Sequence, residues 1–173
     1  KNAKWIAIGR LDFNTSGLLI FTTSGELANR MMHPSFDTER EYSVRIFGQL
    51  SDEQIKLFRS GVELSDGHGV FEACESIGGG GRNRWYKVIV KEGRNRLVRR
   101  MFEALGYQVS RLIRIRFGGV ILPPRLTRGK WLELKDDDVS QLEKQCGLSP
   151  VEPTVQSAKP KQSSSRVTRK TKS

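Results

Sequence analysis

Residues 9–17 read Gly-Arg-Leu-Asp-Phe-Asn-Thr-Ser-Gly, a polar loop with a glycine at each end. An apolar, β-prone run at residues 5–8 leads into this loop, and a second β-prone run at residues 18–22 leaves it. Two strands joined in this way can hold a short polar segment rigidly at the floor of a cleft. The loop carries one carboxylate, Asp12, close to one guanidinium, Arg10. Its polar side chains either tie up turn amides, as in many loops, or form a catalytic centre.

The rest of the sequence predicts an α+β fold with a mixed or mostly antiparallel sheet. Strand-like runs outnumber helix-like runs, and the two kinds do not alternate regularly. Further strands are expected at residues 39–47, 62–64, 70–77, 85–91, 109–117 and 131–134, and helices at residues 25–32, 51–59, 95–105 and 136–145. Residues 1–148 are expected to form the folded domain. Residues 149–173 are rich in Ser, Thr, Pro, Gln, Lys and Arg, which is typical of a disordered basic tail.

The charge of the chain indicates a polyanionic partner. The formal net charge is +11; residues 151–173 contain six Lys or Arg and one Glu, so +5 lies there and +6 in the preceding residues. A folded part that is basic in its own right favours nucleic-acid binding. The chain begins at Lys1, without a methionine and almost inside its first strand, so we expect a fragment that lacks upstream sequence.

The composition disfavours metal and membrane functions. The two cysteines and two histidines do not stand at metal-ligand spacing, so no zinc site is expected. No apolar run approaches the ~20 residues needed to cross a bilayer, and no signal peptide is visible. Free thiols fit a reducing compartment, and we expect a cytoplasmic protein without a membrane partner.

An arginine-rich segment at residues 92–102 is the densest signal after the loop. It reads Glu-Gly-Arg-Asn-Arg-Leu-Val-Arg-Arg-Met-Phe, and in a helix its apolar residues form one buried stripe. Arg96 then lies nearly opposite that stripe, with Arg99 and Arg100 flanking it on either side. Periodicity does not choose between these two. A phosphate-binding face is the favoured interpretation for Arg94, Arg96 and Arg100.

Two strands carry further candidates. Residues 109–117 alternate so that Leu112, Arg114 and Arg116 are expected on one side, and Ile113, Ile115 and Phe117 on the other. Arg114 is expected to be shared between structure and phosphate contact. Tyr42 follows Glu-Arg-Glu on another strand, and a strand tyrosine most often packs in a core.

Several motifs in order resemble one family. The Gly-Arg-Leu-Asp loop, the Gly-Arg-Asn-Arg-x-Val-Arg-Arg pattern at residues 93–100 and the Leu-x-Arg-x-x-x-Gly pattern at residues 112–118 resemble the pseudouridine synthases that act on the ribosomal small and large subunits. The resemblance covers about residues 4–148 and implies a long central sheet with flanking helices and a catalytic cleft. The family's N-terminal S4 domain is absent, as is the lysine-proline strand motif that precedes the loop.

The resemblance also implies residue roles. Asp12 matches the family's catalytic aspartate, and Arg99 matches the arginine that pairs with it. Tyr42 would stack on the target uracil, Leu112 would line the base pocket, and Arg10 would contact RNA. The implied reaction converts one uridine of 23S ribosomal RNA to pseudouridine without a cofactor or metal, and we expect a monomer.

Two other classes of protein remain open at this point. A non-catalytic RNA-binding or ribosome-assembly module would explain the basic charge equally well, since phosphate contacts alone give sequence-independent affinity. Such a module gains nothing from the carboxylate of Asp12 in its RNA groove. A glycosidic-bond hydrolase would need a second carboxylate near Asp12, and Glu39 and Glu41 are available in the sequence.

Overall fold

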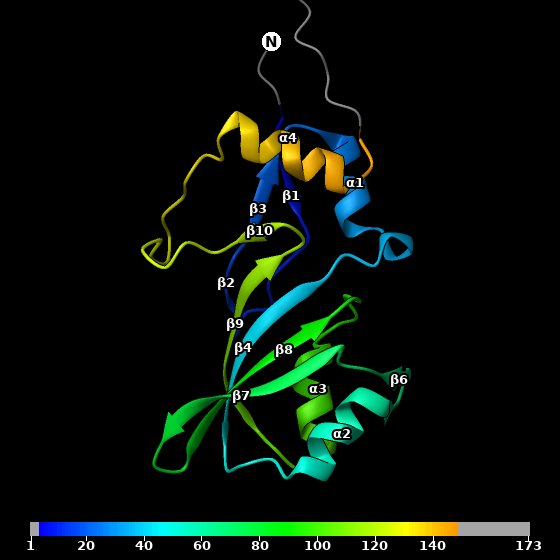
Figure 1. Ribbon diagram of the computed structural model, residues 1–173, viewed down its shortest axis with the longest axis vertical. Helices are drawn as coiled ribbons and strands as arrows, with labels where there is room; N and C mark the ends of the chain where they lie inside the picture. Colours follow the sequence, from blue (N-terminus) through cyan, green and yellow to red (C-terminus); the bar gives the residue numbers. More distant parts are fainter. Residues whose placement is uncertain (1–3, 149–173) are drawn as a thin grey trace, which may run out of the picture.

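The computed structural model describes residues 4–148, which form an elongated α+β body (Figure 1). The strands are β1 Ile6–Ile8, β2 Ser16–Gly17, β3 Ile20–Thr22, β4 Arg40–Phe47, β5 Val62–Leu64, β6 Gly67–Gly69, β7 Ala73–Gly80, β8 Asn83–Val90, β9 Val109–Phe117 and β10 Val120–Ile121. The helices are α1 Gly25–Met32, α2 Asp52–Ser60, α3 Leu97–Ala104 and α4 Asp136–Gln145, with a 3-10 turn at Pro34–Phe36. None of these helices is long and apolar enough to cross a membrane.

The main sheet confirms the expected mixed, mostly antiparallel architecture. Its strand order is β10-β9-β4-β8-β7, all antiparallel, and β2 pairs with β9 in parallel. The long strands β4 and β9 join the lower half of the body, which contains β7, β8, α2 and α3, to the upper half, which contains β1, β3, α1 and α4 (Figure 1).

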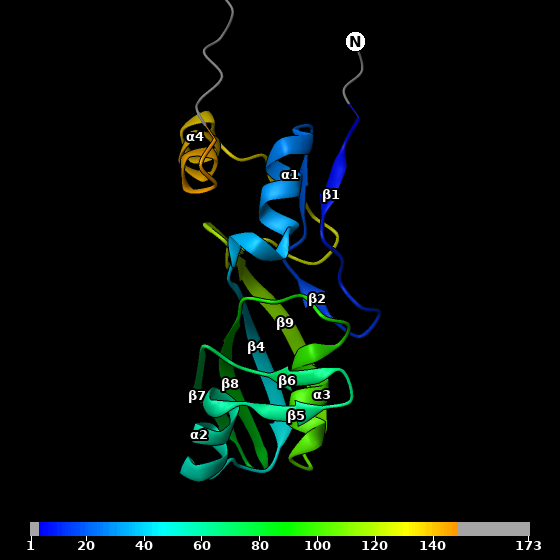
Figure 2. The same cartoon turned by 90° about the vertical axis from the view of Figure 1, so that its right-hand side faces the viewer.

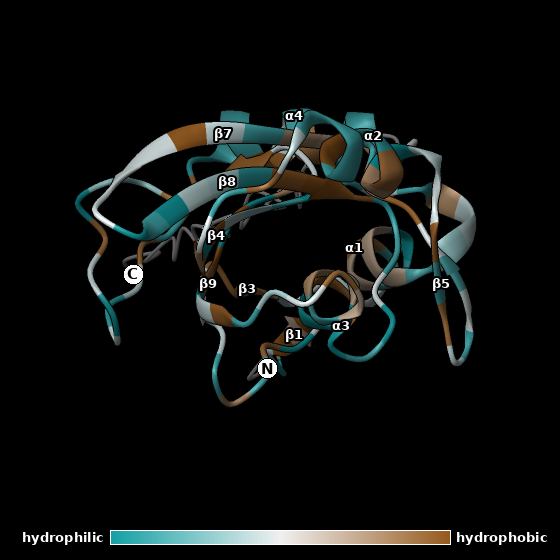
Figure 3. Cartoon of the chain, turned by 90° about the horizontal axis from the view of Figure 1, so that it is seen from below, coloured by the Kyte–Doolittle hydropathy of each residue, from teal (hydrophilic) through white to brown (hydrophobic). Residues whose placement is uncertain are grey.

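Each half has its own hydrophobic cluster. The lower cluster lies between one face of the sheet and α2 and α3, and includes Val44, Phe58, Tyr86, Val88 and Phe102. The upper cluster joins α1 and α4 to β1, β3 and the end of β9, and includes Ile8, Met31, Phe117 and Leu142. Both α2 and α3 lie on the same side of the sheet (Figure 2). Seen from below, β7 and β8 arch over the side on which α3 lies (Figure 3).

A register shift in the β4–β9 pair corrects the predicted faces of β9. Tyr42 lies opposite Arg114, but the next residue, Glu41, lies opposite Arg116, so Ile115 is an extra residue on β9. A bulge of this kind reverses the alternation beyond it. Phe117 therefore shares the helix-covered face with Leu112 and Arg114, and Arg116 lies on the opposite face. The expectation that Arg116 lies beside Arg114 is wrong for this reason.

The helix boundaries follow the capping signals. Ser24 accepts a hydrogen bond from the Leu27 amide at the start of α1, and Ser51 and Gln54 form the reciprocal capping box of α2. The predicted α4 is also present at its expected residues. The helix expected at residues 95–105 is shorter, because Arg96 adopts a left-handed backbone and α3 begins at Leu97.

Three expectations about strands are wrong. Residues 131–134 are not a strand in the structure, since they have no ladder partner. The strand expected at residues 70–77 is β7, which begins only at Ala73 and continues through Gly80, so that the turn to β8 is only Gly81 and Arg82. The run 18–22 is a strand only from Ile20. The basic tail predicted at 149–173 lies outside the described residues.

Candidate active site

The loop that contains Asp12 is fixed to the main sheet at its C-terminal end. β2 pairs with β9 at Ser16–Ile113 and Gly17–Arg114, and the Leu18 amide donates to the Arg114 carbonyl at 2.8 Å. Gly17 has a φ of +103°, and a Cβ there would lie 2.2 Å from the Arg114 carbonyl oxygen. Only glycine allows this close backbone approach, so the second glycine of the loop has a structural cause.

A buried guanidinium holds the two ends of the loop together. Arg114 is only 3% exposed, and its Nε donates to the Leu18 carbonyl at 2.9 Å while its Nη1 reaches the Arg10 carbonyl at 3.3 Å. Its guanidinium also lies over the Phe117 ring, 4.9 Å from the centroid. The structure thus gives Arg114 a structural task, and the phosphate contact expected for it does not fit so buried a side chain.

A second buried guanidinium holds the middle of the loop. Arg99 on α3 is 6% exposed; its Nη2 donates to the Asn14 carbonyl at 2.6 Å and its Nη1 to the Val109 carbonyl at 2.9 Å. Burial lowers the pKa of Arg99, and the charge of Arg96 lowers it further, whereas the carboxylate of Asp12 acts in the opposite direction. Arg99 is the α3 arginine that faces the loop, which is the choice that periodicity left open.

Asp12 and Arg99 lie in one neighbourhood but do not form the ion pair that the resemblance implies. Their side chains make no nitrogen–oxygen contact within 4.0 Å and no hydrogen bond. Arg99 instead donates to the backbone carbonyl of Asn14, two residues after Asp12. The Asp12 carboxylate is half-buried at the turn that the Thr15 amide closes onto the Asp12 carbonyl at 2.9 Å. Arg99 therefore affects Asp12 through the position of the loop backbone.

Tyr42 and Leu112 lie on the same face of the sheet as Arg114. Tyr42 is opposite Arg114 across the β4–β9 ladder, half-buried, and packs against the lower cluster. Leu112 is opposite Val44, 5% exposed, and belongs to that cluster. The face that carries Tyr42 thus also carries the guanidinium that clamps the Asp12 loop, so segments far apart in sequence converge on one place.

The remaining predicted arginines divide into exposed and paired groups. Arg10 and Arg96 are exposed. Arg100 forms two hydrogen bonds with the Asp66 carboxylate, at 2.7 and 2.9 Å, and Arg94 bonds both Asp66 and Glu92. These contacts tie the β5–β6 hairpin to the start of α3. The phosphate-binding face predicted for Arg94 and Arg100 is therefore already occupied by carboxylates.

Buried polar atoms without partners surround the Asp12 loop. Within residues 4–148, the buried side-chain nitrogen and oxygen atoms that lack a hydrogen-bond partner are Thr15 Oγ1, Arg99 Nε and Arg114 Nη2. All three belong to the loop or to its two anchors. Buried donors of this kind usually find partners, so this place has hydrogen-bonding capacity that the protein itself does not use. In the sequence, Arg114 stands two residues after Leu112, which predicts that both side chains lie on the same face of the strand.

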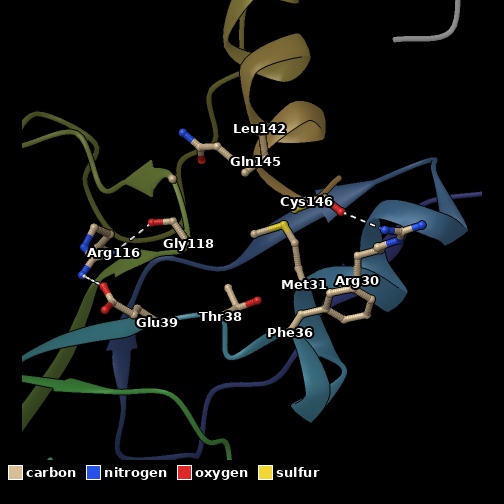
Figure 4. Close-up of a pocket in the computed structure, with 11 residues that line it drawn as sticks. Arg30, Met31, Phe36, Thr38, Glu39, Arg116, Gly118, Leu142, Gln145 and Cys146 are labelled. Atoms are coloured by element: carbon tan, nitrogen blue, oxygen red, sulfur yellow. Dashed lines mark hydrogen bonds and ion pairs between the residues drawn. The ribbon is translucent and has the colours of Figure 1, made fainter. Parts of the chain in front are cut away.

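One cavity lies beside the Asp12 loop, and another lies away from it. A groove of about 1550 Å³ runs along the edge of β9; Arg99, Leu112 and Thr15 line it, whereas Asp12 and Tyr42 do not. A smaller pocket of about 430 Å³ lies between α1, α4 and the end of β9 (Figure 4). There Arg116 contacts Glu39, and Arg30 donates to the Cys146 carbonyl. Residues 4–148 contain no group of three or more His, Cys, Asp or Glu side chains placed to hold a metal ion.

Comparison with known proteins gives one consistent result. The family model of RNA pseudouridylate synthase matches residues 1–104. The chain is 58% identical over 134 residues to the ribosomal large subunit pseudouridine synthase B of Yersinia pestis, which covers 78% of this chain and 42% of that protein. The same protein of Haemophilus influenzae is 56% identical over 146 residues, 84% of this chain and 41% of its own length. The chain therefore spans less than half the length of these relatives.

The solved structures agree in fold. A pseudouridylate synthase crystal structure superposes with a TM-score of 0.70 at 27% identity, over 80% of this chain and 60% of that chain. A chain of an archaeal box H/ACA Nop10–Cbf5 complex gives a TM-score of 0.50 at 20% identity, over 68% of this chain and 40% of that chain, which shows a shared fold alone.

Proposed function

The chain belongs to the RNA pseudouridylate synthase family, and on that premise we propose that it converts a uridine of 23S ribosomal RNA to pseudouridine with Asp12 as the catalytic carboxylate. The observation that carries this proposal is the double anchoring of the Asp12 loop. Two buried arginines from distant segments, Arg99 and Arg114, bind its backbone carbonyls. Catalysis needs its reacting group held in place, and these contacts fix the loop backbone on both sides of Asp12.

The reaction asks little of the protein beyond one carboxylate and a base pocket. The bond between uracil N1 and the ribose carbon breaks, the uracil turns, C5 joins the same carbon, and the C5 proton is lost while N1 is protonated. The reaction is an isomerisation, so it needs no oxidant or reductant. A positioned carboxylate suits either attack on the ribose or removal of its 2′ proton. In both cases Asp12 does the chemistry, and Arg99 helps to hold the loop that carries it by donating to the Asn14 carbonyl.

The target base must leave its stack to reach Asp12, at a cost of a few kcal/mol. Tyr42 lies on the sheet face beside the Arg114 clamp and supplies an aromatic ring, and base–aromatic stacking contributes about 1–3 kcal/mol. Leu112 adds an apolar neighbour on the same face. The donors Arg99 Nε and Arg114 Nη2 have no partner within residues 4–148, so the neighbourhood of the Asp12 loop can still donate hydrogen bonds. Ribosomal RNA as the substrate fits a cytoplasmic protein.

The hydrolase alternative loses its support from the positions of two glutamates. Glu39 and Glu41 both accept hydrogen bonds from Arg116, at 2.9 and 3.1 Å. Arg116 and Glu41 lie on the face of the sheet opposite Tyr42. Neither glutamate is therefore the second carboxylate that a glycosidase mechanism needs beside Asp12.

The decisive experiment is Asp12→Asn, measured on unmodified 23S ribosomal RNA that carries tritium at uracil C5. Conversion releases the tritium to water because C5 loses its hydrogen. We expect the variant to lose about 10²–10⁴-fold or more in turnover while keeping its affinity for RNA. Asp37→Asn is the matched control, because Asp37 is exposed in a left-handed turn that asparagine also adopts. Tritium release by Asp12→Asn at the rate of the control would refute the role of Asp12, and RNA binding without tritium release by the unchanged protein would favour the non-catalytic RNA-binding module.

A further inference from the structure

The sheet face opposite the Asp12 site carries a row of neighbouring basic and aromatic side chains. Both α2 and α3 cover the other face through the lower cluster. On the uncovered face, Arg45 on β4 lies opposite Arg111 on β9 and opposite Trp85 on β8. Phe47, two residues along β4, and Arg82 in the β7–β8 turn continue this row. We call Arg45, Phe47, Arg82, Trp85 and Arg111 the outer-face patch.

The positive charge of the outer-face patch is not neutralised by the protein. Arg45 and Arg111 are like charges directly opposite on adjacent strands, an arrangement that destabilises a sheet. No carboxylate oxygen in residues 4–148 lies within 4.0 Å of Arg45, Arg82 or Arg111. By contrast, Arg116 on β9 is paired with two glutamates, and Arg94 and Arg100 are paired with Asp66. An unpaired cluster that costs stability indicates an anionic partner outside the chain.

Two of the three arginines of the patch lie against aromatic rings. The Arg45 guanidinium lies 5.7 Å from the Trp85 ring centroid, and its Nε donates to Ser110 Oγ at 3.0 Å. The Arg82 guanidinium lies 5.8 Å from the ring centroid of Phe47, which is 58% exposed. Guanidinium groups fixed on aromatic faces lose little entropy when they bind a phosphate. The patch is therefore preorganised and not a set of free surface arginines.

The surface beside Trp85 is open to a long partner. Gly78 lies opposite Trp85 on β7, and a Cβ placed there would meet no atom within 4 Å. Gly80 and Gly81 are equally unobstructed. A strand end without side chains forms a flat surface lined by backbone. Neither cavity described above is lined by Trp85, Arg45 or Phe47. The surface therefore suits a ribose-phosphate chain better than it suits a small molecule.

We propose that the outer-face patch binds the phosphate backbone of the RNA substrate outside the target nucleotide, so that the RNA contacts both faces of the sheet. This inference rests on the proposed function for the identity of its ligand. Charge complementarity selects RNA, because the patch has three unpaired guanidinium groups and aromatic rings for stacking. Arg111 also lines the groove along β9, so the patch continues into that groove at the edge of the sheet.

The test is the salt dependence of binding to an unmodified transcript of 23S ribosomal RNA. The variant Arg45→Gln/Arg111→Gln removes two phosphate contacts, so the slope of log affinity against log salt is expected to fall by about 1.8. The control Lys56→Gln/Arg59→Gln removes two charges from exposed positions of α2 and should leave the slope unchanged. An unchanged slope for the patch variant, or an equal fall in the control, would overturn the proposal.

Two further measurements separate charge from folding and separate this inference from the proposed function. Arg45→Lys/Arg111→Lys keeps both charges and should restore most of the slope; failure to restore it contradicts a phosphate contact. Binding is measured without turnover. A patch variant with a reduced slope, in a protein that converts no uridine, leaves the patch supported and refutes the function. If the unchanged protein converts uridine but the patch variant has an unchanged slope, the function is supported and the patch is refuted. An acidic protein as the true occupant would also leave the RNA slope unchanged.

Discussion

Replacing Arg114 with lysine is expected to slow turnover about tenfold to a hundredfold while RNA affinity stays close to that of the unchanged protein. Arg114 donates to two carbonyls, those of Arg10 and Leu18, from two different nitrogens. A lysine keeps the charge, but one ammonium does not reproduce the fork that spans both acceptors. The variant therefore loses at least one charged hydrogen bond at a site that is 3% exposed.

The expected magnitude follows from that loss. A hydrogen bond to a charged group contributes about 1.5–3 kcal/mol, and 1.4 kcal/mol corresponds to a factor of ten. If this free energy falls on the ordering of the Asp12 loop, the fraction of molecules with the carboxylate in place decreases by the factor stated. If it falls on the whole fold instead, the midpoint of thermal unfolding drops by about 3–12 °C and turnover below that temperature is retained.

Single-turnover tritium release at saturating RNA and thermal unfolding distinguish these outcomes. The matched control is Arg116→Lys, on the same strand but on the opposite face, where Arg116 bonds Glu39 and Glu41. We expect a slower reaction only for Arg114→Lys, without the fall of about 3–12 °C in unfolding temperature that a loss borne by the whole fold would give. Equal turnover in both variants would refute the idea that Arg114 positions the catalytic loop.

Three further predictions concern single positions. Gly17→Ala should abolish turnover and lower the unfolding temperature by thermal melting, because its Cβ would lie 2.2 Å from the Arg114 carbonyl oxygen at a positive φ; a fully active alanine variant would contradict the β2–β9 geometry. The hydrogen bond from Arg100 lowers the pKa of Asp66, so the stability that this carboxylate adds is present at neutral pH and is lost as pH falls below about 4; urea unfolding of Asp66→Asn and the unchanged protein should therefore converge at acidic pH, and a constant difference would count against the ion pair. Burial raises the pKa of the Cys74 thiol to about 12, so native Cys74 should resist alkylation by iodoacetamide at pH 8 in a mass-spectrometric assay and react after unfolding; rapid native labelling would show that it is not buried.

The sequence predicts best where the determining contacts are local. The caps at Ser24 and Ser51 mark the starts of α1 and α2 because each bonds an amide only three residues away. The acidic first turn of α4 marks its start in the same way. The loop of Asp12 was also recognisable, since its glycines and polar residues lie together in the chain.

The sequence fails where tertiary contacts decide. The bulge at Ile115 depends on how β4 and β9 pair, and it moves Arg116 and Phe117 to unexpected faces. The task of Arg114 could not be read either, because its acceptors lie about a hundred residues earlier in the chain. The missing ion pair between Asp12 and Arg99 has the same origin: the backbone at Asn14 competes for the guanidinium, and only the folded structure brings it there.

The distance along the chain between the Asp12 loop and its clamps sets an order of events during protein synthesis. Asp12 is made about one hundred residues before Arg114, and both clamps must leave the ribosome before the loop can be fixed. At about 5–20 residues per second, the loop waits roughly 5–20 s in an unanchored state. A nascent or truncated chain that ends before β9 thus carries the proposed catalytic carboxylate without the two arginines that fix its loop.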